Sequence, residues 1–420
     1  MNGSISENTK AILLLAAPLL SGSKQQNGTR VLSNREYNEL ARLLRERNAQ
    51  PADLLSPSAP ALLADLRLRF DTKRLEELLA RGFLLSQVVE SWSSRAIRVV
   101  SRADPDYPRR FKAKLGLEAP PLLYGSGTWS LLDEGGLAVV GSRHADAALI
   151  EFAQKTGGTC AAAGVAVISG AAKGIDRSAM EGALSTGGRA IGVVADRLAQ
   201  AVISRDAREA IRENRLLLIS PFDPAAGVNV GNAMQRNKLI YGLADAALVV
   251  NADYEKGGTW NGAIEQIKRL RNCLVFAFAD ESISIGNRKL IEAGARPWPN
   301  LTTASDLITF LKKIHPLESV TTGQKREELL PGLREEPFTK YIAPKPSSSD
   351  DAGATPSAKE LLSAVRSILV RELTEPLTKE QVAQLLAIPP KQASTWLKTF
   401  VEQGVLTVIK RPTRYVVSKN

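Results

Sequence analysis

Short apolar runs alternate with longer amphipathic stretches through the middle of the chain. The runs cover residues 137–141, 165–169, 189–194, 215–219, 246–250 and 273–278. Uninterrupted apolar runs of this length are typical of strands that are buried on both faces of a sheet. The intervening segments, for example ALIEFAQKTGGTCAAAG and WNGAIEQIKRLR, have the length and composition of helices. Alternating strands and helices predict an α/β fold with a parallel, doubly wound sheet.

The first 95 residues predict a helical module. Residues 33–48 repeat Leu and Tyr at helical spacing, and Ser33 with Glu36 has the spacing of a capping box. Residues 72–92 read as two helical pieces divided near Gly82. The apolar segment 11–20 is too short to span a membrane and has no clear cleavage site after it, so we expect a buried helix and a cytoplasmic protein. The module either contacts DNA or another protein, or serves only as a packing appendage.

The predicted core extends over residues 96–315 and begins with a Pro- and Gly-containing connector that carries short strands. Residues 316–357 are rich in Pro, Ser and charge, which predicts a flexible linker. Residues 358–420 then predict three helices (358–373, 378–388 and 390–404) and a basic hairpin with its turn at 411–413. This order of elements indicates a winged helix. Its candidate contacts to DNA or a partner are Lys391, Lys398, Lys410, Arg411 and Arg414.

The composition favours an anionic partner and argues against a metal centre. The 420 residues carry a formal net charge of +11, which favours nucleic acid before membrane, although a charge that serves only solubility is an equal alternative. The two cysteines, Cys160 and Cys273, form no CxxC pair, and there are only two histidines, His144 and His315. A disulfide framework or a zinc site is therefore not expected, and no cofactor is implied.

Two Gly-bearing turns with a cation, Arg143 in one and Lys173 in the other, follow predicted strands, and segment 236–238 places further cations just before another apolar strand. In an open α/β sheet, ligands bind outside the carboxyl ends of the strands, and small residues let a ligand approach backbone N–H groups. Arginine adds a planar fork that suits phosphate, and lysine adds a point charge. The turns predict a site for a phosphate-bearing partner. Its candidate residues are Gly141, Ser142, Arg143, Ser169, Gly170, Lys173, Gly174, Arg236, Asn237 and Lys238.

Two further residues near these turns have alternative roles. Asp176 is placed in the first turn of a predicted helix, where a carboxylate favours the helix dipole, so we expect a cap or a brace for Lys173 rather than a catalyst. Trp260, in the Gly-rich segment 257–265, is either a stacking platform for a nucleic-acid base or a partly buried anchor.

These segments together carry a family resemblance. LAVVGSR, SGAAKGID, QRNKLIYGL and GNRKLIEAGA, preceded by DPDYPRRFKAKLGLEAPPLLYGSG, resemble in that order the DprA/Smf family of DNA-processing proteins. The resemblance covers roughly residues 100–300, and the winged helix matches an accessory of many members. The chain differs at Met180, where the family usually has His, and in segment 251–265, which replaces a Ser-Gly-rich stretch. It also lacks a Tyr- and Pro-bearing run within 205–224.

The resemblance implies an extended Rossmann-like core that binds single-stranded DNA without a metal or a catalysed reaction. Such proteins protect incoming DNA and help to load the RecA recombinase, and they pair through their cores as homodimers. By this resemblance Arg143, Lys173 and Arg236 match the basic DNA-contacting positions, Asn237 and Lys238 complete the same motif, and Gly170, Gly174 and Asp176 shape the pocket.

Two other functions share this pocket. One is a nucleotide-cleaving enzyme like the nucleotide phosphoribohydrolases, but GGTWNGAIE lacks their G-T-x-x-E spacing and Glu265 falls too late in it. The other is a sensor that binds a small nucleotide and signals through the winged helix, for instance in defence against foreign DNA.

Overall fold

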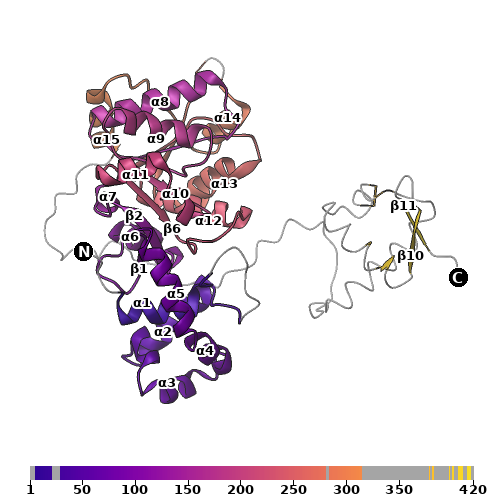
Figure 1. Cartoon of the computed structure of the whole chain (residues 1–420). Helices are drawn as coiled ribbons and strands as arrows, with labels where there is room; N and C mark the ends of the chain where they lie inside the picture. The colour runs from indigo at the N-terminus through magenta and orange to yellow at the C-terminus, as the bar shows by residue number, and fades with distance from the viewer. Residues whose placement is uncertain are drawn as a thin grey trace, which may run out of the picture. The chain divides into compact units, whose positions relative to one another are not determined.

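The computed structural model describes residues 5–20, 29–280 and 283–314, together with parts of 378–417. The chain divides into two compact units, Met1–Thr322 and Gly323–Asn420. The first unit holds the helical module and the α/β core (Figure 1). No helix in the described ranges has the length and apolar character needed to cross a membrane.

The N-terminal module is helical, as predicted. The capping box at Ser33 and Glu36 is present, and the predicted pair of helices divides near Gly82. The apolar segment forms a helix whose Ile12, Leu13 and Leu15 are fully buried, which confirms the expected buried helix. The elements are α1 (Glu7–Ala16), α2 (Asn34–Glu46), the 3-10 helix η1 (Pro51–Leu55), α3 (Ala59–Leu66), α4 (Thr72–Leu79) and α5 (Gly82–Ser93).

The central sheet has the predicted α/β character. All six predicted strands are present with ends shifted by no more than two residues, and the connector supplies β1 and β2. The strands are β1 (Arg98–Ser101), β2 (Leu122–Gly127), β3 (Leu137–Val140), β4 (Val167–Ser169), β5 (Ala190–Val193), β6 (Leu216–Ser220), β7 (Ala246–Val249), β8 (Leu274–Ala277) and β9 (Arg296–Pro297). Their order is β1-β2-β6-β5-β4-β3-β7-β8-β9, and all neighbours pair in parallel except β1–β2 and β2–β6.

This strand order creates a switch point between β3 and β7. From β3 the chain adds β4, β5 and β6 on one side, and then adds β7, β8 and β9 on the other. The connections leaving β3 and β7 therefore diverge, and they leave a crevice at the carboxyl ends of these two strands. In a doubly wound sheet, this crevice is the expected place for a ligand.

Helices cover both faces of the sheet because strand side chains alternate between the two faces. Leu137 and Val139 pack into one core with α8 and α9, whereas Ala138 and Val140 pack into the other with α12 and α13. The helices of the core are α6 (Arg109–Leu115), the 3-10 helix η2 (Gly116–Glu118), α7 (Leu131–Glu134), α8 (Ala147–Ala162), α9 (Ile175–Ser185), α10 (Leu198–Ala201), α11 (Arg205–Arg212), α12 (Val230–Leu243), α13 (Gly257–Glu265), the π-helix η3 (Gln266–Leu270), α14 (Ile285–Glu292) and α15 (Ala304–Ile314).

Helices α8 and α9 approach each other closely because glycine stands at their contact. A methyl group added at Gly157 would lie 2.1 Å from the carbonyl oxygen of Ala179, and one added at Gly182 would lie 2.1 Å from that of Gln154. The neighbouring Gly158 has space, since its nearest atom would be 3.9 Å away. Only the first two positions therefore require glycine for packing.

The second unit is described in part. Strands β10 (Leu406–Ile409) and β11 (Arg414–Val417) form the predicted antiparallel hairpin. Thr378 and Gln381 exchange the two hydrogen bonds of the predicted capping box, at 3.3 and 2.9 Å. The linker 316–357 and the candidate contact residues Lys391, Lys398, Lys410 and Arg411 lie outside the described residues. The division into module, core, linker and winged helix stays a prediction.

Candidate nucleic-acid site

A pocket of about 380 Å³ opens at the switch point. Its walls come from the turn after β3 (141–144), the loops after β5 and β6, helix α12 and the segment 253–259. Asn251, which follows β7, accepts a hydrogen bond through Oδ1 from the backbone N–H of Ser142 at 2.9 Å. The segments that follow β3 and β7 are thus joined to each other, and the turn with Gly141 and Arg143 is held at the edge of the pocket.

Arg236 enters this pocket from α12 and is almost fully buried, with 5% of its surface exposed. Its Nη1 donates to the carbonyl oxygen of Val193 at 2.8 Å, while Nε has no partner among the described residues. Burial lowers the pKa of the guanidinium, and the carboxylate of Asp176 opposes this effect. Arg143 also acts on Arg236 as a like charge, so the two arginines lie close to each other.

Asp176 braces the turns around Arg236. Its carboxylate accepts a hydrogen bond from the backbone N–H of Gly141 at 3.3 Å, and further backbone bonds come from Gly170 and Ala172. Burial raises the pKa of this carboxyl group, and Arg236 works in the opposite direction. The brace expected at this position is present, but it supports Arg236 and the two turns rather than Lys173.

Ser169 and Gly170, at the end of β4, do not line the pocket. Ser169 is fully buried, and its Oγ donates to the carbonyl oxygen of Val139 at 2.6 Å, so the hydroxyl group joins β4 to β3 instead of facing a ligand. A methyl group on Gly170 would lie 1.6 Å from Nη1 of Arg236 and 2.5 Å from Oδ2 of Asp176. The absence of a side chain at residue 170 is what leaves room for the guanidinium.

Arg143 and Lys173, the cations of the two predicted turns, differ in their position relative to the pocket. Arg143 is exposed and lines the pocket together with His144. Lys173 is exposed but is not part of the pocket wall. It lies next to Gly174, where an added methyl group would approach the carbonyl oxygen of Ser142 to 2.6 Å. Lys173 therefore belongs to a turn that packs against the Ser142–Arg143 backbone, outside the pocket itself.

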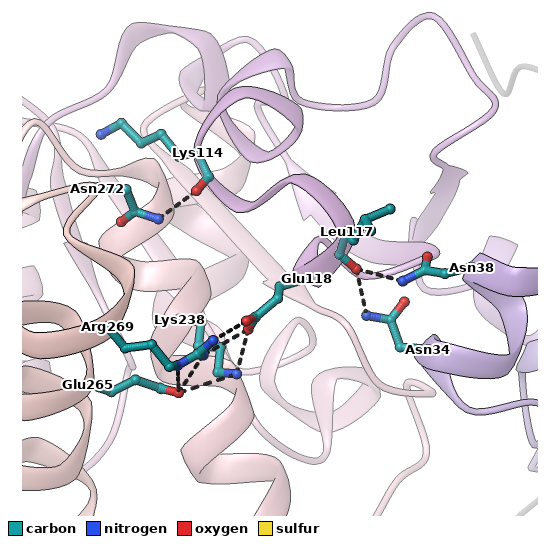
Figure 2. Close-up of polar contacts among 9 residues, drawn as sticks. All are labelled: Asn34, Asn38, Lys114, Leu117, Glu118, Lys238, Glu265, Arg269 and Asn272. Atoms are coloured by element: carbon teal, nitrogen blue, oxygen red, sulfur yellow. Dashed lines mark hydrogen bonds and ion pairs between the residues drawn. The ribbon is translucent and has the colours of Figure 1, made fainter. Parts of the chain in front are cut away.

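Lys238 does not reach the pocket. Its Nζ contacts Glu118 at 2.7 Å and Glu265 at 3.4 Å, and Arg269 binds the same two carboxylates (Figure 2). The hydrogen bond from Arg269, followed in size by that from Lys238, holds the pKa of Glu118 at about 2, despite the opposing effect of burial. Lys238 thus takes part in an ion-pair network that joins η2 to α12 and α13, and its contact with DNA stays a prediction.

Contacts in and next to this network bear on the enzyme hypothesis and on the role of the helical module. Glu265, the candidate catalyst of the enzyme hypothesis, is paired with Arg269 at 2.6 Å and does not line the pocket. Figure 2 also shows Asn34 and Asn38 of α2 donating to the carbonyl oxygen of Leu117, next to Glu118. Residues 117–118 thus connect the helical module to the core, which favours a packing role for this part of the module.

Residues in and next to the rest of the wall show features that the sequence analysis missed or left open, and Tyr254 and Trp260 do not themselves line the pocket. Asn237 uses its Nδ2 to bond the carbonyl oxygen of Gly258 at 2.8 Å, so it joins α12 to α13. Trp260 is 8% exposed and acts as a buried anchor, while Tyr254, 42% exposed, meets its ring edge-on at a centroid distance of 5.0 Å. Tyr254 thus carries the exposed ring. Lys256, also in the wall, adds a cation.

Comparisons with known proteins agree with this architecture. The family model described as DNA recombination-mediator protein A matches residues 98–312, just over half of the chain. The DNA processing protein DprA of Bacillus subtilis is 25% identical over 261 residues, which cover 60% of this chain and 85% of that protein. Protein Smf of Synechocystis sp. is 27% identical over 226 residues, which cover 51% and 56% of the two chains.

The crystal structure of DNA processing protein A from Streptococcus pneumoniae shares the fold. It superimposes with a TM-score of 0.50 at 22% identity, and the match covers 66% of this chain and 98% of that one. The sheet order, the pocket at the switch point and the family match over residues 98–312 lead to one conclusion. The chain belongs to the DNA recombination-mediator protein A family, the DprA/Smf proteins.

Proposed function

We propose that this protein binds single-stranded DNA at the switch-point pocket. The observation that carries the proposal is the meeting of Arg143 and Arg236 in one pocket at the carboxyl ends of β3 and β7. Guanidinium groups suit phosphate oxygens, and the turn that carries Arg143 is held in place by the bonds of its backbone N–H groups to Asp176 and Asn251. Family membership supports a DNA ligand for the same surface.

The acidic groups of the pocket fit a nucleotide better than a simple anion. Asp176 is buried against Arg236, whereas Asp196 and Asp253 line the wall as further carboxylates. A bare anion would be repelled by these two groups, but a nucleotide also carries base N–H groups that donate to carboxylates. The exposed ring of Tyr254 lies in the same segment as Asp253 and offers a face on which a base can stack.

We further propose a binding role without catalysis, exerted on DNA together with a RecA-type recombinase and by a homodimer. The carboxylate that the enzyme hypothesis requires, Glu265, is held by Arg269 and Lys238. Incubation with nucleoside monophosphates should therefore release no base. Base release that Glu265→Gln abolishes would contradict this part of the proposal. Mixing the protein with a RecA-type recombinase on coated single strands, and measuring its mass in solution, tests the two partners.

The test of DNA binding is a titration of single- and double-stranded oligonucleotides over a salt series. Each phosphate contact adds about 0.7 to the slope of log affinity against log salt for a single strand. Arg143→Ala, Lys173→Ala and Arg236→Ala should each weaken single-strand binding and lower this slope. Arg177→Ala is the matched control, because Arg177 is exposed on α9 and pairs with Glu181. Unchanged slopes in all three variants would place binding elsewhere in the chain.

A further inference from the structure

A second hollow of about 570 Å³ adjoins the switch-point pocket. Two loops pass from one to the other. In the loop after β5, Asp196 lines the pocket and Arg197 lines the second hollow. In the loop after β6, Val228 lines the pocket and Ala225 lines the second hollow. Asp196 and Arg197 are consecutive, and Val228 and Ala225 lie three residues apart, so the two hollows are neighbours on one surface.

Arg197 is held rigidly at the border between them. Its backbone adopts a left-handed conformation with φ of 49°, and its N–H bonds the carbonyl oxygen of Ala226 at 2.8 Å. A non-glycine residue costs roughly 1–2 kcal/mol in this conformation, so the surrounding loops must enforce it. The side chain is exposed, and it forms no ion pair with any residue that the structure describes.

A third hollow continues the path along α11. Ile203 lines both the second and the third hollow, and Arg205, Arg208 and Arg212 line the third. Residues three and four apart share one face of a helix, with Cβ atoms about 5–6 Å apart. Ala207 and Ala210 are buried on the opposite face and fix the direction in which the arginines point.

The charge of this helix face is positive. None of the three arginines is ion-paired within the described part of the chain, and Glu209 is the carboxylate that lines the hollow with them. Glu213, at the end of the helix, is occupied by Arg215. We call Arg197, Arg205, Arg208 and Arg212 the arginine track. Three of its four members lie in segment 205–224, where the sequence departs from its family resemblance.

We propose that the arginine track is a second DNA-binding surface, which contacts the phosphates of a single strand as it leaves the switch-point pocket. The inference rests on the proposed function, since it assigns a path to the same ligand. A row of positively charged side chains that continues from the pocket fits a polymer with regularly repeated negative charge. The strand would run from the carboxyl end of β5 over Arg197 and Ile203 onto α11.

The test compares short and long oligothymidylates, of about 6 and about 30 nucleotides, on the full chain. The variant carries Arg205→Gln, Arg208→Gln and Arg212→Gln, which are exposed positions where substitution leaves folding intact. Its affinity for the short strand should equal that of the wild type. On the long strand its salt slope should fall by about 2, since three contacts contribute about 0.7 each. Adding Arg197→Gln should lower the slope further by about 0.7.

The matched control removes the same charge from another helix. Arg35→Gln, Arg42→Gln and Arg45→Gln take three exposed arginines from α2 in the N-terminal module. This control should leave the long-strand slope at the wild-type value. An unchanged slope in the α11 variant, or an equal fall in the α2 control, would overturn the arginine track. Failure of the wild type to bind either oligonucleotide would instead contradict the proposed function and remove the ligand of the track with it.

Discussion

Gly170→Ala tests whether the buried position of Arg236 builds the site. Residue 170 has no left-handed backbone angle, so alanine is conformationally acceptable there and all of its effect comes from the added methyl group. That methyl group would lie 1.6 Å from Nη1 of Arg236, against an ordinary contact of about 3.5 Å. The guanidinium must therefore leave its place and lose its hydrogen bond to Val193.

The expected cost follows from these contacts. Losing a hydrogen bond from a charged group costs about 1.5–3 kcal/mol, and overpacking a tight site costs about 1–3 kcal/mol. Because the clashing atom ends a long side chain, part of the overlap is relieved by rotation, and the reduced entropy of the unfolded chain returns about 0.4–1 kcal/mol. We expect Gly170→Ala to lower the free energy of unfolding by about 1–3 kcal/mol and to weaken single-strand binding.

A double-mutant cycle separates this clash from a general effect of the substitution. Urea unfolding and oligonucleotide titration are measured for Gly170→Ala, Arg236→Ala and the double variant. If the methyl group acts by displacing Arg236, the two substitutions are strongly non-additive, with a coupling of about 1 kcal/mol or more. Additive effects in the cycle, or wild-type binding by Gly170→Ala, would show that the methyl group does not act by displacing Arg236.

Three further predictions concern packing and the ion-pair network. Gly157→Ala should lower the free energy of urea unfolding by about 1–3 kcal/mol, because its methyl group meets the backbone of α9. Gly158→Ala should instead raise this free energy by about 0.5–1 kcal/mol. Equal effects of the two substitutions would contradict the close helix contact. Lys238→Ala should lower the free energy of unfolding by about 0.5–1 kcal/mol and leave the salt slope of DNA binding unchanged. A fall of about 0.7 in that slope would instead show that Lys238 contacts the DNA. The pKa of Glu118 is about 2 in the folded protein, below the ordinary 4.5 of the unfolded chain. The ionised carboxylate therefore contributes fully to the free energy of unfolding above about pH 4.5, and this contribution is lost as the pH falls toward 2. After allowance for solvent screening it amounts to about 1 kcal/mol, and Glu118→Gln should flatten the acid limb of a stability–pH curve by this amount.

The sheet could be predicted from sequence because its strands are buried on both faces. Such strands appear as uninterrupted apolar runs, and LAVV at 137–140 and AALV at 246–249 are clear examples. Small β-bridges leave no such signal, which is why the two-residue strand β9 at Arg296–Pro297 was missed. The switch point itself depends on which strands become neighbours, and the order of runs along the chain does not determine that.

The candidate site could be predicted only as far as its turns. Gly141 and Arg143 stand at the carboxyl end of β3, where a ligand site is expected, and Arg236 reaches the same pocket from α12. The pairing of Lys238 with Glu118 joins residues 120 positions apart, and no local pattern encodes such a contact. Likewise, Trp260 and Tyr254 are both aromatic in sequence, and only the packing of α13 decides which ring is buried.

If a DNA strand occupies the switch-point pocket, photocrosslinking should trap it there. A single-stranded oligonucleotide that contains 5-bromouracil is bound to the full chain, irradiated, and mapped by mass spectrometry after proteolysis. Adducts are expected in the peptides that carry residues 141–144 and 253–259, where His144 and Tyr254 are exposed, and they should be lost in Arg143→Ala. Adducts confined to residues 5–95 or 358–420, with none in the pocket peptides, would contradict occupation of the pocket by DNA.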